Sequence, residues 1–325
     1  MESSQAVLVS VVCNTYNHEK FIRDALEGFV MQKTNFAYEV LIHDDASTDK
    51  TADIIREYEA KFPEIIKPIY QTENQYSKGG ILQFQEPRIK GKYVALCEGD
   101  DYWTDPLKLQ KQFDAMEAHP EIDICAHVAS SVNAVTGERK NIFHPADEVE
   151  ILPVESIIMG GGGFVATASL FMRAPFYSTQ KEFSRFLRLD YTLQIQGALR
   201  GGMLYLPDCM CDYCVMTSGS WTASIAKDKE KQRAHISKVQ KMLEILNEET
   251  GGKYDTTIRQ RILKNEFDLA LSMQAYKTLV LKKYKLFYKE LPQKTQLKFR
   301  LKASFPFLIT IKNKLNKKSR RTSNG

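Results

Sequence analysis

The first 130 residues alternate between short runs of aliphatic residues and longer segments with apolar residues at helical spacing. Residues 7–13 are almost continuously apolar, as in a strand buried on both faces of a parallel sheet. This alternation predicts an α/β fold with right-handed crossovers, and such folds bind ligands at the carboxyl ends of their strands. Further strands are predicted at 38–43, 65–70 and 93–97, and helices at 21–30, at 81–90 and from a cap at Ser47 or Thr48 to Ala60.

The remaining chain is less regular. Residues 131–225 mix patterns, with a predicted strand at 165–172 and a predicted helix at 190–200, and the pattern from residue 226 onward is helical. We therefore expect an α/β domain over residues 1–225, a helical extension over 226–290 and a basic amphipathic tail over 291–325.

Charge is unevenly distributed along the chain. The last 45 residues contain 14 of the 45 Lys and Arg but one of the 40 Asp and Glu, so the first 280 residues carry a net charge of −8. A mildly acidic body argues against a nucleic-acid partner. The apolar residues interleaved with the basic ones in the tail suit contact with an anionic membrane surface, and a helix packed on the body with a solvated charged face remains the alternative.

We do not expect a secretory signal peptide at the start of the sequence or a membrane span within it. Residues 1–5 lack a basic region, and no stretch reaches the roughly 18 apolar residues of a membrane span. We expect a cytoplasmic protein, peripheral on the inner face of the plasma membrane through its tail.

The segments that follow the predicted strands exclude two common phosphate-binding motifs. Asn14-Thr15-Tyr16-Asn17 follows the first strand, where a dinucleotide-binding protein would carry G-x-G-x-x-G. The P-loop lysine motif is also missing from the sequence. A glycine-rich phosphate cradle is therefore not expected.

Two acidic clusters stand at the predicted strand ends. Residues 44–49 read Asp-Asp-Ala-Ser-Thr-Asp, and residues 98–101 read Glu-Gly-Asp-Asp. Aspartates cap helices and form turns, which could explain the first cluster. Three carboxylates within four residues are excessive for a cap, since neighbouring carboxylates repel each other. The second cluster therefore favours a hard divalent cation, Mg²⁺ or Mn²⁺, bound together with a substrate's phosphates.

These motifs, in this order, resemble glycosyltransferase family 2. The resemblance rests on residues 7–17, Asp-Asp-Ala-Ser-Thr-Asp at 44–49, Gly-Lys-Tyr at 91–93 and Glu-Gly-Asp-Asp-Tyr-Trp at 98–103, and it extends over roughly residues 6–222. It implies a GT-A fold, a Rossmann-like and mostly parallel sheet flanked by helices. It also implies an inverting enzyme that uses nucleotide-diphosphate sugars.

The resemblance implies roles for individual residues. Asn14 and Tyr16 would face the nucleotide, and Asp45 would bind its base. Glu98 and Asp100 would lie in the family's D-x-D region and contact the donor, with Glu98 where many members have the first aspartate.

The metal and the base follow from the same resemblance. Asp100 and Asp101 would handle a divalent cation and the diphosphate. Asp190, at the start of a predicted helix, matches the family's catalytic aspartate, although a helix cap alone would also explain it. Ser220 and Trp221 lie in a segment that resembles a loop closing over the donor, and Trp103 could stack on a sugar or base or pack in the core.

The predicted function is inverting transfer of a sugar from a nucleotide-diphosphate donor, with UDP favoured, to a saccharide or lipid-linked acceptor in cell-surface polysaccharide synthesis. One alternative is a nucleotidyltransferase of related fold, although that class usually has a glycine-rich basic loop after the first strand. Another is a degenerate, non-catalytic protein that binds sugar nucleotides, for which Glu98 in place of aspartate is the sole support.

Overall fold

The computed structural model describes residues 6–78, 80–215, 225 and 228–305. The chain divides into two compact units, residues 1–220 and residues 221–325. None of the helices within the described residues combines the length and apolar character needed to cross a bilayer.

The first unit is built on one sheet. Its strands are β1 (Val7–Thr15), β2 (Ala37–Asp44), β3 (Ile66–Tyr70), β4 (Tyr93–Leu96), β5 (Tyr102–Trp103), β6 (Ile124–Asn133), β7 (Arg139–Phe143), β8 (Glu150–Leu152), β9 (Phe171–Arg173) and β10 (Met203–Val215). They lie in the order β3-β2-β1-β4-β9-β6-β10-β5, with β7 beside β6 and β8 beside β10. The pairs β1–β2, β1–β4, β2–β3 and β6–β10 are parallel.

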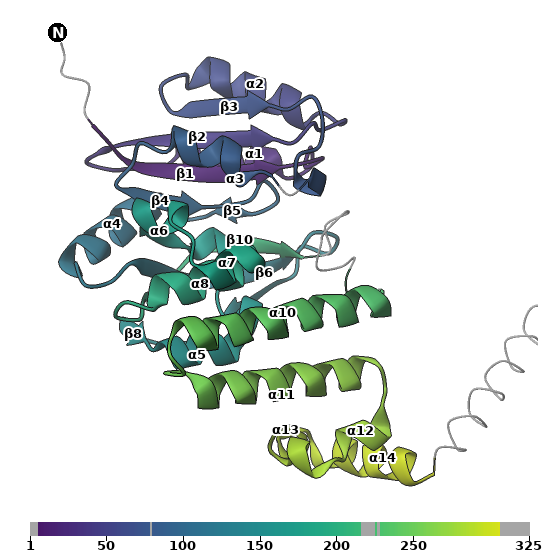
Figure 1. Ribbon diagram of the computed structural model, residues 1–325. Coiled ribbons are helices and arrows are strands. Elements are labelled where there is room, and N and C mark those ends of the chain that lie inside the picture. The colour runs from purple at the N-terminus through teal and green to yellow at the C-terminus, as the bar shows by residue number, and fades with distance from the viewer. Residues whose placement is uncertain (1–5, 79, 216–224, 226–227, 306–325) are drawn as a thin grey trace, which may run out of the picture. The chain divides into compact units, whose positions relative to one another are not determined.

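Helices flank this sheet (Figure 1). They are α1 (Ile22–Val30), α2 (Thr51–Lys61), α3 (Leu82–Gln85), α4 (Lys108–Ala118), α5 (Val154–Gly160), α6 (Ala174–Ser178), α7 (Glu182–Phe186) and α8 (Asp190–Ala198), with 3₁₀ turns η1 (Tyr76–Lys78), η2 (Glu86–Arg88), η3 (Gly161–Gly163) and η4 (Thr167–Ser169). The predicted α/β fold, with a mostly parallel sheet between helices, is confirmed.

The strand register brings three carboxyl ends together. Thr15 at the end of β1 lies beside Asp44 at the end of β2, and Val12 pairs with Leu96 at the end of β4. Two further backbone bonds continue the pairing past the strands: the Asp45 amide donates to the Thr15 carbonyl over 2.9 Å, and the Gly99 amide donates to the Asn14 carbonyl over 3.0 Å. The acidic clusters that follow β2 and β4 therefore flank the loop after β1.

Two local predictions are wrong. The strand expected at 165–172 is the turn η4 followed by the short strand β9, because the carbonyls of η4 bond to side chains from elsewhere in the unit rather than to a neighbouring strand. The helix expected at 81–90 is shorter and consists of α3 and η2. Pro87 lies inside η2 and lacks the amide that a longer helix needs.

The second unit is helical, as predicted. It contains α10 (Lys229–Glu249), α11 (Asp255–Ser272), α12 (Tyr276–Leu279), the 3₁₀ turn η5 (Lys282–Tyr284), α13 (Lys285–Glu290) and α14 (Gln293–Ser304). One of its cores joins Phe267 of α11 to Leu279 of α12 and to Phe287 and Tyr288 of α13.

Candidate active site

The loops after β1 and β2 are bound to each other. The Asn17 amide donates to Ser47 Oγ over 2.9 Å, and the Thr48 amide donates to Asn17 Oδ1 over 2.8 Å. Asn17 has a φ of 56°, a left-handed conformation that asparagine tolerates better than most residues. The bonds fix both loops at the carboxyl edge of the sheet.

The predicted cap of α2 by Ser47 or Thr48 is wrong. The helix begins at Thr51, whose amide donates to Asp49 Oδ1 over 2.9 Å. Ser47 and Thr48 instead bond to Asn17, so the acidic run after β2 serves both the helix and the neighbouring loop.

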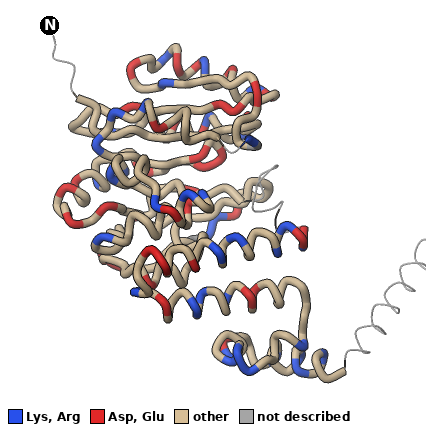
Figure 2. Tube along the Cα trace, viewed as in Figure 1, with Lys and Arg blue, Asp and Glu red and all other residues tan. Residues whose placement is uncertain are grey.

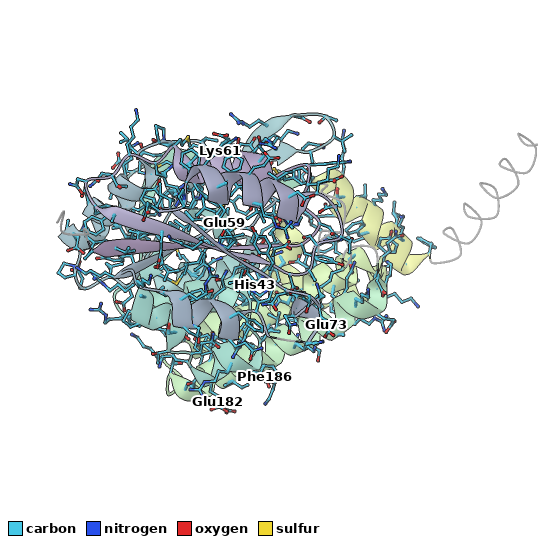
Figure 3. The ribbon with its side chains drawn as sticks, turned by 90° about the horizontal axis from the view of Figure 1, so that it is seen from above. His43, Glu59, Lys61, Glu73, Glu182 and Phe186 are labelled. Atoms are coloured by element: carbon cyan, nitrogen blue, oxygen red, sulfur yellow. The ribbon has the colours of Figure 1, made fainter. Side chains whose placement is uncertain are left out.

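Asp45 is buried and holds the next segment of chain. Its Oδ1 accepts the Gln75 amide over 2.7 Å, and its Oδ2 accepts the Tyr76 amide over 3.0 Å. His43, which lies inside the body (labelled in Figure 3), has its Nε2 3.3 Å from Asp45 Oδ1. Burial lowers the pKa of His43 despite the nearby carboxylate, which favours the neutral imidazole. The contact of Asp45 with a base stays a prediction.

Asn14 and Tyr16 lie on the same edge. Asn14 Oδ1 accepts from Gln85 Nε2 over 3.3 Å, and the buried Gln85 also donates to the carbonyls of Cys13 and Leu41. Tyr16 is exposed, and so is Tyr76, whose backbone Asp45 holds. The charge of Glu98 contributes, after burial, to raising the pKa of Tyr76, which indicates that this tyrosine lies near the second acidic cluster.

Gly99 allows the second cluster to approach the loop after β1. A Cβ at this position would lie 2.5 Å from Thr15 Oγ1, closer than real contacts allow. His18 connects the two segments, since its Nδ1 lies 3.2 Å from Thr15 Oγ1 and its Nε2 lies 3.9 Å from Asp100 Oδ2. Glycine is therefore needed to place Glu98 and Asp100 beside β1.

The carboxyl group of Glu98 has a strongly raised pKa. Its side chain is exposed to solvent by area, yet enough protein surrounds its carboxylate that desolvation raises its pKa. The charges of Asp100 and Asp190 raise the pKa further, to about 8. Glu98 therefore retains its proton at neutral pH unless a positive charge arrives.

Asp101 is buried beneath this edge. Its Oδ1 accepts the backbone amide of Cys214 in β10 over 2.8 Å, and its Oδ2 has no hydrogen-bond partner among the described residues. Burial, with the charge of Asp100 next in effect, raises its pKa well above the usual value. One oxygen of Asp101 thus attaches the acidic loop to β10, and the other is a buried acceptor without a donor in the part of the chain that the structure describes.

Asp190 is the first residue of α8, where a carboxylate interacts favourably with the helix dipole. Its Oδ2 accepts from Thr167 Oγ1 over 2.9 Å, and its Oδ1 accepts the Tyr191 amide over 2.6 Å. Burial raises its pKa in spite of these two bonds. The charge of Asp190 acts on Glu98, so the fold brings α8 near the acidic loop although Glu98 and Asp190 are 92 positions apart in sequence.

Trp103 belongs to the core, so the structure does not place it in a binding loop. It is buried, its ring meets Phe29 edge to face at 5.0 Å, and its Nε1 donates to the Ala168 carbonyl over 3.0 Å. Ser220 and Trp221 lie outside the described residues.

The carboxylates fit a partly protein-bound cation better than a closed metal cage. Within the described residues no three His, Cys, Asp or Glu side chains have the arrangement needed to hold a metal ion. Asp100 and the Oδ2 of Asp101, which no described residue bonds, could supply oxygen ligands. Mg²⁺ and Mn²⁺ accept such sites, because substrate phosphates and water complete their coordination.

Sequence reasoning missed Thr167, Gln85 and Tyr76. Each of them forms a hydrogen bond with a predicted site residue. That residue is distant in sequence in every case, and Tyr76 forms its bond through the backbone amide. A hydroxyl in a small-residue segment and a glutamine in a short helix carry no signal of such contacts.

The family comparison agrees with this geometry. The protein-family model described as glycosyl transferase family 2 matches residues 10–178 of the sequence, which is more than half of the chain. The chain therefore belongs to glycosyltransferase family 2.

Among curated proteins, an uncharacterized protein of Mycobacterium tuberculosis is 37% identical over 216 residues, 66% of this chain and 60% of that protein. The chain thus matches about 60% of the length of the first such relatives. The putative teichuronic acid biosynthesis glycosyltransferase TuaG of Bacillus subtilis is 38% identical over 109 residues, 34% of this chain and 42% of that protein.

Solved structures share the fold. TarS of S. aureus, residues 1–349 in complex with UDP-GlcNAc, aligns with a TM-score of 0.53 at 17% identity and covers 84% of each chain. The mannosyltransferase PcManGT of Pyrobaculum calidifontis, in complex with GDP-Man and Mn²⁺, aligns with a TM-score of 0.51 at 15% identity, covering 93% of this chain and 87% of that one. The predicted GT-A fold is confirmed.

Proposed function

We propose that this protein transfers a sugar from a nucleotide-diphosphate donor to a hydroxyl group of an acceptor, with inversion at the anomeric carbon. The observation that carries the proposal is the convergence of Glu98, Asp100 and Asp190 at the carboxyl edge of the sheet. A cluster of carboxylates needs a positive charge or a proton to be stable, and the raised pKa values of Glu98 and Asp190 within it are typical of a functional site.

The donor would bind across the loops after β1, β2 and β4. Asn14, exposed Tyr16 and Asp45 are proposed to lie along the nucleotide, and Tyr76 joins them as an exposed ring fixed by Asp45. Complexes of TarS with UDP-GlcNAc and of PcManGT with GDP-Man support a nucleotide sugar, and we favour a UDP-sugar.

Glu98 and Asp100 are proposed to face the diphosphate end of the donor. Mn²⁺ or Mg²⁺, when bound, would stabilise the negative charge on the leaving diphosphate. Asp101 can offer only Oδ2 to a cation, since its Oδ1 holds Cys214. We therefore assign Asp100 the main cation contact and Asp101 a supporting one.

Asp190 is proposed as the general base. An acceptor hydroxyl is a poor nucleophile at neutral pH, so a carboxylate must take its proton as it attacks. The Thr167 hydroxyl and the Tyr191 amide orient the carboxylate and favour its ionised form against the effect of burial. A single base opposite the leaving group gives inversion without a covalent intermediate.

The names of two relatives support an acceptor in cell-surface polysaccharide synthesis. They are TuaG and the poly(ribitol-phosphate) beta-glucosyltransferase of Bacillus spizizenii, which is 32% identical over 95 residues, 29% of this chain and 15% of that protein. We propose a saccharide or lipid-linked acceptor, reached from the cytoplasmic side of the plasma membrane.

Product analysis tests this proposal. The purified chain would be incubated with single nucleotide sugars, Mn²⁺ or Mg²⁺ and saccharide acceptors, and the released nucleotide would be identified by chromatography. Free nucleoside diphosphate is expected, together with a glycosidic bond to the acceptor whose anomeric configuration is inverted relative to the donor. Pyrophosphate would instead indicate nucleotidyl transfer, and binding without turnover would indicate a non-catalytic protein; either result would contradict the proposal.

A further inference from the structure

Helix α14 exposes an apolar stripe. Leu297, Leu301 and Phe305 at its end are exposed by 62%, 48% and 45%, and none of the side chains of α14 is fully buried. Their spacing of four residues places them on one side of the helix. Large exposed apolar groups in a row mark a surface that contacts something apolar.

The opposite side of α14 is already occupied. The ring of Phe299 lies 5.3 Å from that of Tyr276 in α12, and Lys302 Nζ donates to Tyr276 Oη over 2.9 Å. Gln296 Nε2 donates to the carbonyls of Lys289 over 3.2 Å and Leu291 over 2.7 Å. These contacts fix the rotation of α14, so its apolar stripe points away from the helices it packs against.

Positive charge surrounds the stripe. Residues 281–305 contain eight Lys and Arg but one acid, Glu290. Figure 2 shows the basic residues gathered along α13 and α14. Lys294 and Lys298, three residues before Leu297 and Leu301, are exposed, and exposed Leu286 of α13 lies between exposed Lys285 and Lys289 in sequence.

We propose that α13 and α14 form a docking surface for an anionic lipid bilayer, with Leu297, Leu301 and Phe305 entering the interface and the surrounding lysines contacting headgroups. Helices that lie in the membrane plane combine an apolar face with a basic one, and each basic residue near an anionic surface contributes about 1 kcal/mol. A second copy of this surface is disfavoured as the occupant, because two cationic surfaces repel. The proposal does not depend on the enzymatic activity.

Vesicle sedimentation with the full chain tests the proposal. Vesicles of phosphatidylcholine alone are compared with vesicles that also contain phosphatidylglycerol, at low and high salt. We expect binding to the anionic vesicles that weakens as salt screens the charges. Lys294→Glu with Lys298→Glu should weaken it about 30-fold or more, since two attractive groups are lost. Leu297→Gln with Leu301→Gln should weaken it about 10-fold or more.

Matched variants test whether vesicle binding depends on this surface or on the total charge and hydrophobicity of the protein. Lys231→Glu with Lys238→Glu changes two exposed lysines of α10, and Val135→Gln with Val149→Gln changes two exposed apolar residues of the first unit. Both control pairs should bind anionic vesicles within about 3-fold of the wild type. Donor turnover in solution should be unchanged in all four double variants, which separates a failure here from a failure of the proposed function.

Three results would overturn the proposal. The wild type could fail to bind anionic vesicles at low salt. The variant with Leu297→Gln and Leu301→Gln could bind vesicles as the wild type does, which would assign membrane binding to another segment, such as residues 306–325. The wild type could form dimers that the leucine pair abolishes without any lipid effect, which would make a second copy the occupant.

Discussion

The carboxylate of Asp190 receives two hydrogen bonds from different segments, and the Thr167 hydroxyl is the donor that can be removed without changing the backbone. Thr167→Val keeps the shape of the side chain and deletes the donor. A hydrogen bond to a charged group contributes about 1.5–3 kcal/mol, so kcat should fall about 10- to 100-fold. Thr167→Ser, the matched control, should stay near the wild type.

The pH profile separates this role from a general structural one. The Thr167 bond lowers the pKa of Asp190, so its loss should move the acidic limb of the kcat/KM profile to higher pH. Loss of activity with an unmoved limb and a reduced Tm would instead make Thr167 structural.

Glu98 gives a second residue-level prediction. Its pKa is about 8 in the folded chain and near 4.5 when unfolded, so the folded state holds this proton more tightly. Stability of the ligand-free chain should therefore fall as pH rises between these values and level off above about 8. Glu98→Gln removes this dependence, and its Tm advantage over the wild type should grow from about pH 5 to about pH 8. A constant difference would contradict the raised pKa.

At the scale of elements, the turn η4 is held by two side chains from β5 and α4. Trp103 Nε1 bonds to the Ala168 carbonyl, and Gln112 Nε2 of α4 bonds to the Ser169 carbonyl over 2.9 Å. Gln112 Oε1 also accepts from the buried amine of Lys108 over 2.7 Å, and burial lowers the pKa of Lys108 to about 8. Thr167, which orients Asp190, is part of this turn.

Gln112→Leu should therefore destabilise the first unit by about 2–4 kcal/mol, since it leaves a buried carbonyl and a buried amine without partners. Gln110→Leu, on the same helix but only half-buried, should cost under about 1 kcal/mol. Denaturant unfolding measures both. Equal losses would show that the bonds of Gln112 to η4 and Lys108 are unimportant.

The elements also show where sequence reasoning succeeds. The runs that became β1, β2 and β4 are mainly apolar and buried, so their pattern was readable. The long strand β6 was missed because it buries His127, Ser130 and Ser131 among its apolar residues. The helix α4 was missed for the same reason, since Lys108 and Gln112 are fully buried. Buried polar residues are stabilised by distant partners, which a local pattern does not reveal.

At the scale of the whole molecule, the charge asymmetry of the sequence corresponds to two units of different character. The acidic body contains the candidate site, and the helical unit carries a cationic surface with exposed leucines. The acidic loop was recognisable from sequence because its charges are adjacent, and Asp190 was recognisable only through family resemblance. The proximity of Asp190 to the acidic loop depends on the fold.

The central claim is that Asp190 acts on a donor bound by the acidic loop, and one paired measurement tests it. Asp190→Asn and the wild type are compared for UDP-sugar binding with Mn²⁺ by calorimetry and for turnover in the same buffer, with Asp53→Asn, an exposed residue of α2, as the control. We expect Asp190→Asn to bind the donor within about 3-fold of the wild type while its kcat falls about 10³-fold or more. Donor affinity that collapses in parallel with turnover, or turnover that survives the change, would contradict the account.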